Sequence, residues 1–508
     1  MNGVINAVIQ NDDKPIDIEL FDIAKCFDSL WLKECLNDLY EAGLDNSNLN
    51  LLYEGNRECY ISVKTPNGQT DRILLNEIVM QGSVWGPLCC TATMDKIGQK
   101  SYSSGSPLYT YKGMVSIPPL GMVDDELTIA ECGPDATLTN VVMNNFTESK
   151  KLRFGIKKCN KMHIGTPTLV CDEIRVHEDV GKTVSKDKYV GDILTVNGTN
   201  TETIKERADK GFGIVNEIVS ILSEIPLGPY RTSVGLKLRE AMLLNGILFN
   251  SEIWYNVKEE EEQRLSEVDE YLLRSILGVP SKTPKEALFL ETGCIPVKFI
   301  LKMRRLMYLH HILKRPNEEL IKKFYDAQKC KMSKGDWVQT VNENLKELDI
   351  KLNEKEISQM SKHKFRSVLK KKIRKAAFMY LIKKKESHSK MSGTDYEKLE
   401  IQSYLKSDSG LNIDLKKLLV NFRTRMYQVR QNYKNQYEDT LCQLCKTERE
   451  DQQHLFMCPE IIKECEDLAN NVEIEYEDIF GTRAKQMKAV QLLAKIVETR
   501  ERLIDKSD

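Results

Sequence analysis

Two adjacent aspartates, Asp124 and Asp125, stand between short apolar runs, and a third aspartate, Asp22, ends an alternating segment far upstream. The apolar runs predict a β-hairpin with the paired carboxylates at its tip. Residues 16–22 alternate polar and apolar side chains, which predicts a strand ending near Asp22. Placing this strand beside the hairpin would bring three like charges together, which is costly unless a divalent cation neutralises them. Such oxygen ligands suit Mg²⁺ or Mn²⁺, and two of these ions can stabilise the attacking and leaving oxygens of a displacement at phosphorus.

An aspartate pair alone is more often a solvated turn, so the argument depends on the segments around it. These segments are, in chain order, Phe21 to Trp31, a predicted helix over 32–40, Met80 to Leu88, Lys151 to Cys159 and Tyr189 to Asp192. Their order and spacing resemble the palm motifs of reverse transcriptases, and within that family they are most similar to non-LTR (LINE-type) retrotransposons. The resemblance implies an RNA-directed DNA polymerase built on a palm domain.

The resemblance implies catalytic roles for four residues. Asp22, Asp124 and Asp125 would hold two Mg²⁺ (or Mn²⁺) ions in the palm. Lys158 would donate a proton to the departing pyrophosphate, a general-acid role for which the site must tune its pKa. In the alternative structural interpretation, Lys158 is a solvated surface lysine.

Other residues would contact the substrates. Phe27 would crowd a ribose 2′-hydroxyl and so favour deoxynucleotides. Gln81 and Gly82 would approach the nascent base pair, where the missing Cβ of glycine leaves room for backbone. Residues 189–191 would form the hairpin that grips the primer terminus. The structural alternatives are a core aromatic at Phe27, a turn at Gln81 and Gly82, and an edge strand at 189–191.

The chain departs from the family pattern at its beginning. Only 21 residues precede Asp22, whereas the family carries a fingers region there whose basic residues hold the incoming triphosphate. Lys14 is the only lysine or arginine before Lys25. The resemblance therefore implies an N-terminally truncated reverse transcriptase that lacks the fingers and endonuclease regions. Two smaller departures are Met122, where an aromatic residue is usual, and Gly86, where a small polar residue is usual.

A second group of potential metal ligands lies near the C-terminus. Cys442, Cys445, His454 and Cys458 form a C-x2-C-x8-H-x3-C arrangement, and this spacing is typical of a tetrahedral zinc site. Cys465 is an alternative fourth ligand. Four protein ligands leave no open position for substrate, so we expect a structural Zn²⁺. The arrangement also resembles the C-terminal zinc knuckle of LINE-type elements.

The composition indicates a globular protein with an uneven charge. The chain has 508 residues, of which 41% are hydrophobic and 29% charged, and a net charge of −1. It has no apolar run long enough for a membrane span and no signal-peptide pattern, so we expect an intracellular protein without membrane partners. The 14 cysteines are mostly isolated, which favours reduced thiols. Positive charge is densest from Lys362 to Lys390, with twelve basic residues and one acidic residue.

This basic segment has the spacing of a helix. Five apolar residues recur every four positions within it, namely Phe365, Leu369, Ile373, Ala377 and Leu381. The pattern predicts one buried stripe and a basic face that could neutralise nucleic-acid phosphates. A solvated face on a packed helix is the alternative. The segment is also typical of a nuclear-import signal, so we expect a nuclear location.

Together the patterns and the resemblance imply an α+β polymerase palm, an antiparallel sheet with packed helices, followed by a mostly helical thumb and a C-terminal region with a small zinc knuckle. Helical spacing recurs over 204–225, 236–256 and 259–277. The expected domains are a palm (1–198), a thumb-like region (199–330), a basic helical nucleic-acid-binding region (331–437), a CCHC zinc knuckle (438–462) and a helical tail (463–508).

The first function hypothesis is two-metal transfer of a nucleotide from a dNTP to a primer 3′-hydroxyl, with an RNA template and a DNA primer or target DNA as partners. The second is a catalytically incompetent nucleic-acid-binding remnant that retains the palm fold. The third is another two-metal nucleotidyl transferase such as a viral RNA polymerase. Phe27 argues against the third, because enzymes that use ribonucleotides need space for the 2′-hydroxyl. The oligomeric state is not indicated.

Overall fold

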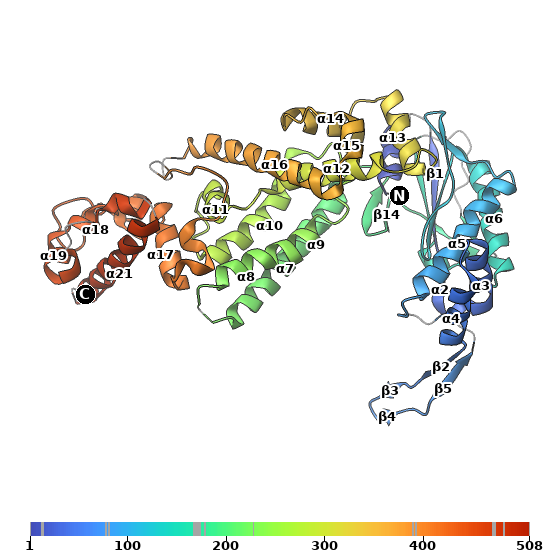
Figure 1. Cartoon of the computed structure of the whole chain (residues 1–508), viewed down its shortest axis with the longest axis horizontal. Coiled ribbons are helices and arrows are strands. Elements are labelled where there is room, and N and C mark those ends of the chain that lie inside the picture. The colour runs from blue at the N-terminus through green and yellow to red at the C-terminus, as the bar shows by residue number, and fades with distance from the viewer. Residues whose placement is uncertain are drawn as a thin grey trace. The chain divides into compact units, whose positions relative to one another are not determined.

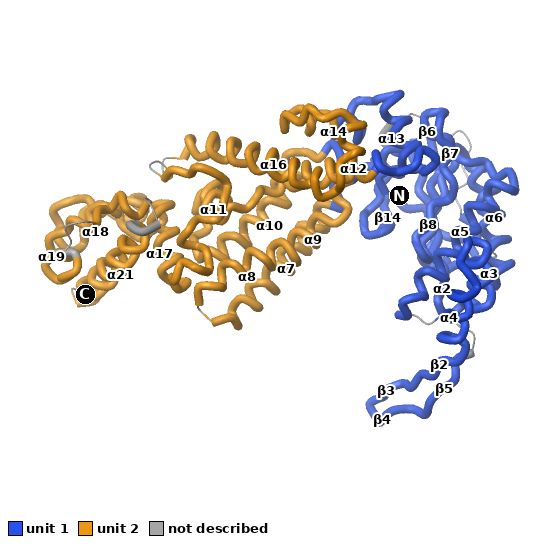
Figure 2. Tube along the Cα trace, in the orientation of Figure 1, with its two compact units in different colours: residues 1–203, 253–256, 312–340 blue, residues 204–252, 257–311, 341–508 orange. Residues whose placement is uncertain are grey.

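The computed structural model of the chain describes all residues except 1, 12–14, 77–78, 80–81, 166–173, 177–178, 227, 389–390, 392–393, 470–473, 481–482 and 507–508. The chain forms two compact units, and neither is continuous in sequence (Figure 1, Figure 2). Unit 1 contains residues 1–203, 253–256 and 312–340, and unit 2 contains residues 204–252, 257–311 and 341–508. Within the described residues, every helix is too short or too polar to span a lipid bilayer.

Unit 1 is built on a five-stranded sheet with the order β13-β10-β1-β9-β8. Its central strand β1 (Ile16–Asp22) pairs antiparallel with β9 (Asp125–Ala130) on one side and with β10 (Asn160–Ile164) on the other. Strand β8 (Leu120–Met122) pairs antiparallel with β9, while β13 (Lys182–Thr183) pairs parallel with β10 at the other edge. The strand predicted to end at Asp22 and the hairpin predicted around the aspartate pair are both confirmed.

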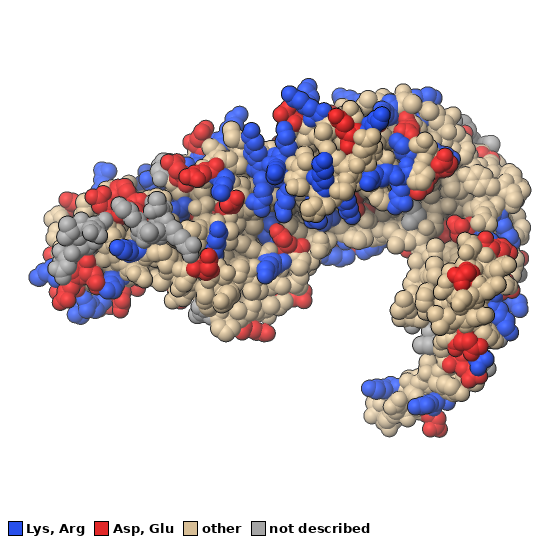
Figure 3. All heavy atoms as spheres, in the orientation of Figure 1, with Lys and Arg blue, Asp and Glu red and all other residues tan. Residues whose placement is uncertain are grey.

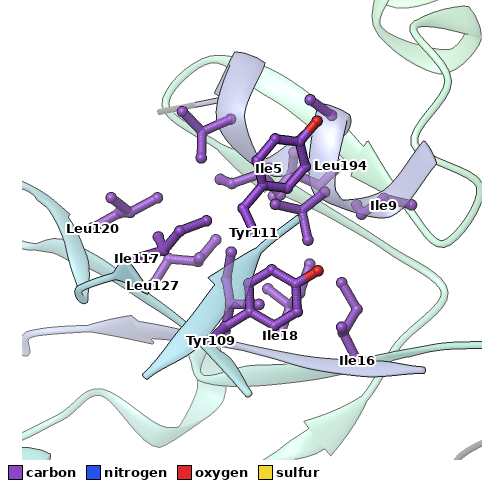
Figure 4. Close-up of a cluster of buried hydrophobic side chains, with 14 of the residues drawn as sticks. Ile5, Ile9, Ile16, Ile18, Tyr109, Tyr111, Ile117, Leu120, Leu127 and Leu194 are labelled. Atoms are coloured by element: carbon purple, nitrogen blue, oxygen red, sulfur yellow. The ribbon is translucent and has the colours of Figure 1, made fainter. Parts of the chain in front are cut away.

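Both faces of this sheet are covered by other elements. Side chains alternate between the two faces along a strand, so neighbouring residues of β1 pack into different clusters. On one face, Phe21 belongs to a buried cluster with residues of helices α3 (Leu32–Glu41), α5 (Gly86–Ser103) and α6 (Gly133–Ser149). On the other face, Leu20 belongs to a cluster with residues of helix α1 (Asn2–Asn11) and of the strands β6 (Tyr109–Tyr111) and β7 (Val115–Ile117). Figure 4 shows Ile5, Ile18 and Tyr109 within this second cluster.

Helix α13 (Leu320–Cys330) belongs to unit 1 although it lies far from the sheet strands in sequence. The ring of Phe324 stacks on the ring of Tyr111 with 4.2 Å between centroids. Nearby, Lys112 Nζ lies 3.1 Å from Asp336 Oδ2, and the two side chains are almost completely buried. A late segment of the chain therefore completes one wall of the core of unit 1.

Helices account for most of unit 2. The principal ones are α7 (Thr201–Glu224), α8 (Arg231–Leu238), α9 (Asn245–Ile247), α10 (Glu259–Leu277), α11 (Lys285–Thr292), α12 (Val297–Leu313), α14 (Trp337–Glu347), α15 (Glu354–Gln359), α16 (Lys362–Lys385), α17 (Ile413–Arg423) and α21 (Arg483–Asp505). The helices predicted over 204–225 and 259–277 are confirmed. The helix predicted over 236–256 ends earlier, at Ile247, where Leu248 leaves the helical conformation (φ −109°, ψ 18°), and Asn250 then adopts a left-handed conformation (φ 60°).

Helix α16 has the predicted apolar stripe. The five residues that recur every four positions are all buried, namely Phe365, Leu369, Ile373, Ala377 and Leu381. The remaining face carries lysine and arginine side chains, which gather over α16 in Figure 3.

Candidate active site and metal centre

The pairing of β1 with β9 brings the predicted carboxylates together. In this register Asp22 lies directly opposite Asp125, and Asp125 in turn lies opposite Met122 of β8. Val123 and Asp124 form the turn between β8 and β9. The backbone N–H of Ile23 donates to the carbonyl oxygen of Asp124 at 3.3 Å, which ties the end of β1 to this turn. All three aspartates thus lie at the same end of the sheet, where β1 ends and β9 begins.

The turn that carries Asp124 is strained. Val123 has φ 65°, a left-handed conformation that costs a β-branched residue on the order of 1–3 kcal/mol. Its carbonyl oxygen accepts a hydrogen bond from the thiol of Cys90 on α5 at 3.4 Å. Strain of this kind persists only where surrounding contacts impose it, and it is concentrated at functional sites.

Lys158 contacts this carboxylate cluster directly. Its Nζ donates to Asp22 Oδ1 at 2.8 Å, and this bond raises the pKa of Lys158. Lys158 lies in the 3-10 turn Ile156–Lys158, which approaches Asp22 because Gly155 N–H donates to the backbone oxygen of Asp22 at 2.8 Å. A Cβ at Gly155 would lie only 3.1 Å from Asp22 Oδ2, so glycine makes this close approach possible.

The cluster has the electrostatics of a cation site. Burial raises the pKa of Asp125, the charges of Asp124 and Asp22 raise it further, and the charge of Lys158 opposes them. A divalent cation would relieve this repulsion, and carboxylate oxygens are suitable ligands for Mg²⁺ or Mn²⁺. The three aspartates are not among the described groups whose ligand atoms all lie within 4.8 Å of one another. A bound ion would therefore have to draw them closer and displace Lys158 from Asp22.

Two of the predicted substrate-contacting residues, Phe27 and Gly82, lie within the described part of the chain. Phe27 is half-buried in the short helix α2 (Cys26–Ser29) and packs against the cluster that contains Phe21. Gly82 has φ 85°, a conformation that favours glycine, and a Cβ added there would meet no atom within 4 Å. Gln81 lies outside the described residues.

The predicted primer-grip segment forms the turn between β14 (Lys186–Tyr189) and β15 (Asp192–Thr195). The Tyr189 hydroxyl is buried and donates to the carbonyl oxygen of Leu120 at 2.6 Å. This bond attaches the β14–β15 hairpin to β8, the strand that leads into the aspartate turn.

The four C-terminal ligands predicted from their spacing come together in unit 2. Cys442, Cys445, His454 and Cys458 each offer a ligand atom, and these atoms lie within 4.8 Å of one another. The sulfur atoms of Cys442 and Cys458 are 3.8 Å apart, and Cys445 Sγ is 3.4 Å from His454 Nε2. Tetrahedral zinc requires edges of roughly 3.8 Å between sulfurs and roughly 3.6 Å between sulfur and nitrogen. The centre could therefore hold a zinc ion, consistent with a structural role, and Cys465 is not part of the group.

Two short elements position these ligands. A turn after Cys442 is closed by bonds from Lys446 N–H to Cys442 oxygen at 3.0 Å and from Cys442 N–H to Glu448 oxygen at 2.8 Å. His454 begins helix α18 (His454–Met457), where its N–H donates to Asp451 Oδ1 at 2.7 Å, and Cys458 follows the last turn. Cys458 caps this helix four residues after His454, on the same face, so both side chains could ligate one ion.

Glu448 orients the histidine ligand. His454 Nδ1 lies 3.1 Å from Glu448 Oε2, which fixes the proton on Nδ1 and directs the Nε2 lone pair toward the cysteines. We expect Glu448→Gln to weaken zinc binding about tenfold, because the carboxylate raises the basicity of the ligand nitrogen. Competition with a chromophoric chelator would measure this change. Glu466→Gln, an exposed carboxylate outside the centre, should leave the affinity unchanged, and equal affinities for both variants would contradict the assignment.

Sequence patterns did not identify all residues of these sites. Gly155 stands inside the predicted 151–159 segment, and its position after Phe154 was a usable signal. Glu448 gave no signal, because an exposed glutamate before a zinc ligand has no distinctive spacing.

No protein-family model matches the chain, and no curated protein matches it either. Among solved structures, the chain is similar to the telomerase from Candida albicans, determined in complex with a TWJ fragment of telomeric RNA. The identity is 12% and the TM-score 0.28, and the similarity covers 55% of this chain and 48% of that chain. The chain therefore spans about half of the solved telomerase chain. A TM-score this low supports no functional argument.

Proposed function

We propose that the chain is the RNA-directed DNA polymerase of a LINE-type retrotransposon. The observation that carries this proposal is the β1–β9 register, which sets Asp22 opposite Asp125 beside the turn that presents Asp124. The order of the surrounding motifs supports it. Two Mg²⁺ (or Mn²⁺) ions held by these aspartates would supply charge stabilisation at the α-phosphate of a dNTP.

The chain's own residues would divide the remaining work. Lys158 would leave Asp22 when a metal arrives, and its ammonium group would then be free to protonate the departing pyrophosphate. Phe27 would limit the space at the sugar and select deoxynucleotides. The Tyr189 hairpin, held to β8, would align the primer terminus with the aspartate turn.

A second candidate is a nucleic-acid-binding protein that retains the palm but does not polymerise. The observation in its favour is the ion pair between Lys158 and Asp22, which engages a carboxylate oxygen that a catalytic metal requires. In this second candidate Asp124 and Asp125 have no catalytic role, so a metal-dependent polymerase activity would exclude it.

Primer extension tests the first candidate against the second. The full chain with an RNA template, an annealed DNA primer, Mg²⁺ and dNTPs should extend the primer. Asp125→Asn should lower the rate about 100-fold or more, because a lost metal ligand removes several kcal/mol of transition-state stabilisation. Asp179→Asn, at an exposed aspartate elsewhere in unit 1, is the control and should retain activity. Absence of extension by the unaltered chain that nevertheless binds the primer–template would favour the second candidate.

The basic face of α16 is the proposed contact for RNA or target DNA, and a nuclear location is part of the same proposal. Eight of its basic residues are exposed and have no carboxylate partner among the described residues, namely Lys362, Lys364, Arg366, Lys370, Lys371, Lys375, Lys383 and Lys384. Unpaired cations of this kind can neutralise phosphates and release counterions.

We expect the triple variant Lys370→Gln, Lys371→Gln, Lys375→Gln to bind single-stranded RNA more weakly and with a shallower salt dependence. Each lost phosphate contact should reduce the slope of log K against log salt by about 0.7. Fluorescence anisotropy over a series of salt concentrations would measure it. An unchanged slope would place the binding surface elsewhere.

A further inference from the structure

A pocket of about 270 Å³ lies beside the aspartate turn of unit 1. Helix α5 contributes one wall through Met94, Asp95 and Gly98, and the β8–β9 hairpin contributes another through Gly121 and Glu126. Glu126 pairs with Phe21 in the sheet register, so it lies on the face covered by α3, α5 and α6, whereas Asp22 and Asp125 alternate to the face covered by α1. The pocket is therefore separate from the candidate metal site.

Glu126 is the unusual feature of this pocket. Glu126 is only 3% exposed, and within the described part of the chain its side chain has no hydrogen-bond or ion-pair partner. The carboxyl oxygens line the pocket and are not fully enclosed by protein. A cationic ligand in the pocket could therefore form a charge-assisted hydrogen bond with them.

The neighbouring residues make room for the carboxyl. A Cβ added at Gly121 would overlap the Glu126 carboxyl, so the glycine leaves the space that this side chain occupies. At Gly98 a Cβ would meet no atom within 4 Å, which shows that the pocket is open on the α5 side.

The chemistry of the lining selects a class of ligand. Two carboxyl groups, of Asp95 and Glu126, line the pocket, and none of its lining residues is a lysine, arginine or histidine. Asp95 is exposed and, among the residues that the structure describes, forms no ion pair. The other walls include Met94, Tyr102 and Val123, which offer apolar and aromatic surface. A volume of about 270 Å³ exceeds the space that a bare metal ion fills, and it suits a small organic molecule.

We propose that this pocket binds a small organic cation, whose ammonium or amidinium group pairs with Glu126 and Asp95 while its apolar body lies against Met94 and Tyr102. The proposal is independent of polymerase activity, since neither carboxyl belongs to the Asp22 cluster.

Calorimetry with the full chain tests this proposal with benzylamine as the probe and benzyl alcohol as its neutral counterpart. We expect benzylamine to bind at one site and benzyl alcohol to bind at least about tenfold more weakly, since a charge-assisted bond contributes more than a neutral one. Equal binding of the two probes, or binding of neither, would overturn the proposal.

Three variants locate the site. Gly98→Leu fills the pocket from α5 and keeps both carboxyls, and Glu126→Gln removes the buried acid without changing its size. Each should reduce benzylamine affinity at least about tenfold. Glu58→Gln, an exposed glutamate remote from the pocket in sequence, should have no effect. If Gly98→Leu lowers the melting temperature, weaker binding by this variant could reflect unfolding, and Glu126→Gln alone then tests the proposal. Unchanged benzylamine binding by Glu126→Gln would exclude the pocket.

Discussion

Removing zinc from the centre formed by Cys442, Cys445, His454 and Cys458 is expected to unfold the segment that carries these ligands. The segment has little regular secondary structure, because its one helix, α18, has four residues and its hairpin a single β-bridge, between Leu441 and Arg449. The buried ion pair between Glu450 and Arg500 also attaches it to α21, so the loss of structure should be greatest around the ligands themselves. Zinc binding contributes roughly 10–16 kcal/mol to the folding of small zinc modules at neutral pH. Three of the four ligands are buried, so an empty centre would leave thiols and imidazole without compensating bonds.

Hydrogen exchange read by mass spectrometry, before and after a strong chelator, measures this outcome. Amides of residues 441–458 should lose protection, while those of α10 in the same unit should keep theirs. Cys442→Ser should cause the same loss of protection when no chelator is added. Cys330→Ser, at an exposed cysteine outside the centre, is the matched control. Persistent protection of residues 441–458 in the metal-free chain would show that packing alone folds the segment.

Glu291→Gln is expected to reduce the free energy of unfolding of unit 2 by about 3–5 kcal/mol. Glu291 is fully buried at α11 and accepts a hydrogen bond from Arg423 Nε at 2.9 Å. It also accepts from the hydroxyls of Tyr396 at 2.6 Å and Tyr404 at 2.7 Å. The change to an amide would leave the Arg423 charge, which is only 2% exposed, without a compensating anion.

Urea unfolding followed by far-UV circular dichroism, which reports the loss of the helices that dominate unit 2, would measure this change. Glu397→Gln, an exposed glutamate in the same region, should change the midpoint little. The double variant Glu291→Leu with Arg423→Met should lose less stability than Glu291→Gln, because it removes both charges together. A double variant less stable than the single one would show that the hydrogen bonds themselves, and not charge pairing, hold the cluster.

Local patterns predicted much of the fold, because they depend on neighbours in sequence. The alternation of residues 16–22 was enough to predict β1, and the spacing of Cys442 to Cys458 was enough to predict the metal centre. The contact between Lys158 and Asp22 was not predictable in detail, because it depends on the close approach at Gly155. The Glu291 cluster was missed for a related reason. Its members come from segments far apart in the chain, and a buried glutamate has no pattern that distinguishes it from a solvated one.

The location of the Asp124 turn along the chain was predicted, but its backbone conformation was not. Its apolar flanks indicate a hairpin, yet a valine at φ 65° contradicts the preference for glycine or asparagine in tight turns. Such a conflict between local preference and the overall fold is typical of functional sites. A second conflict of the same kind is Glu126, a buried glutamate whose side chain has no protein partner within the described residues.

The late return of α13 to the core of unit 1 has a consequence for synthesis on the ribosome. Tyr111 and its hairpin emerge early, but Phe324, which stacks on Tyr111, is translated only after the first helices of unit 2. Until α13 has left the exit tunnel, an aromatic surface of the nascent chain faces water. The growing polypeptide would therefore carry a chaperone-binding surface for much of its elongation, and a gene fragment that stops before α13 would encode an aggregation-prone product.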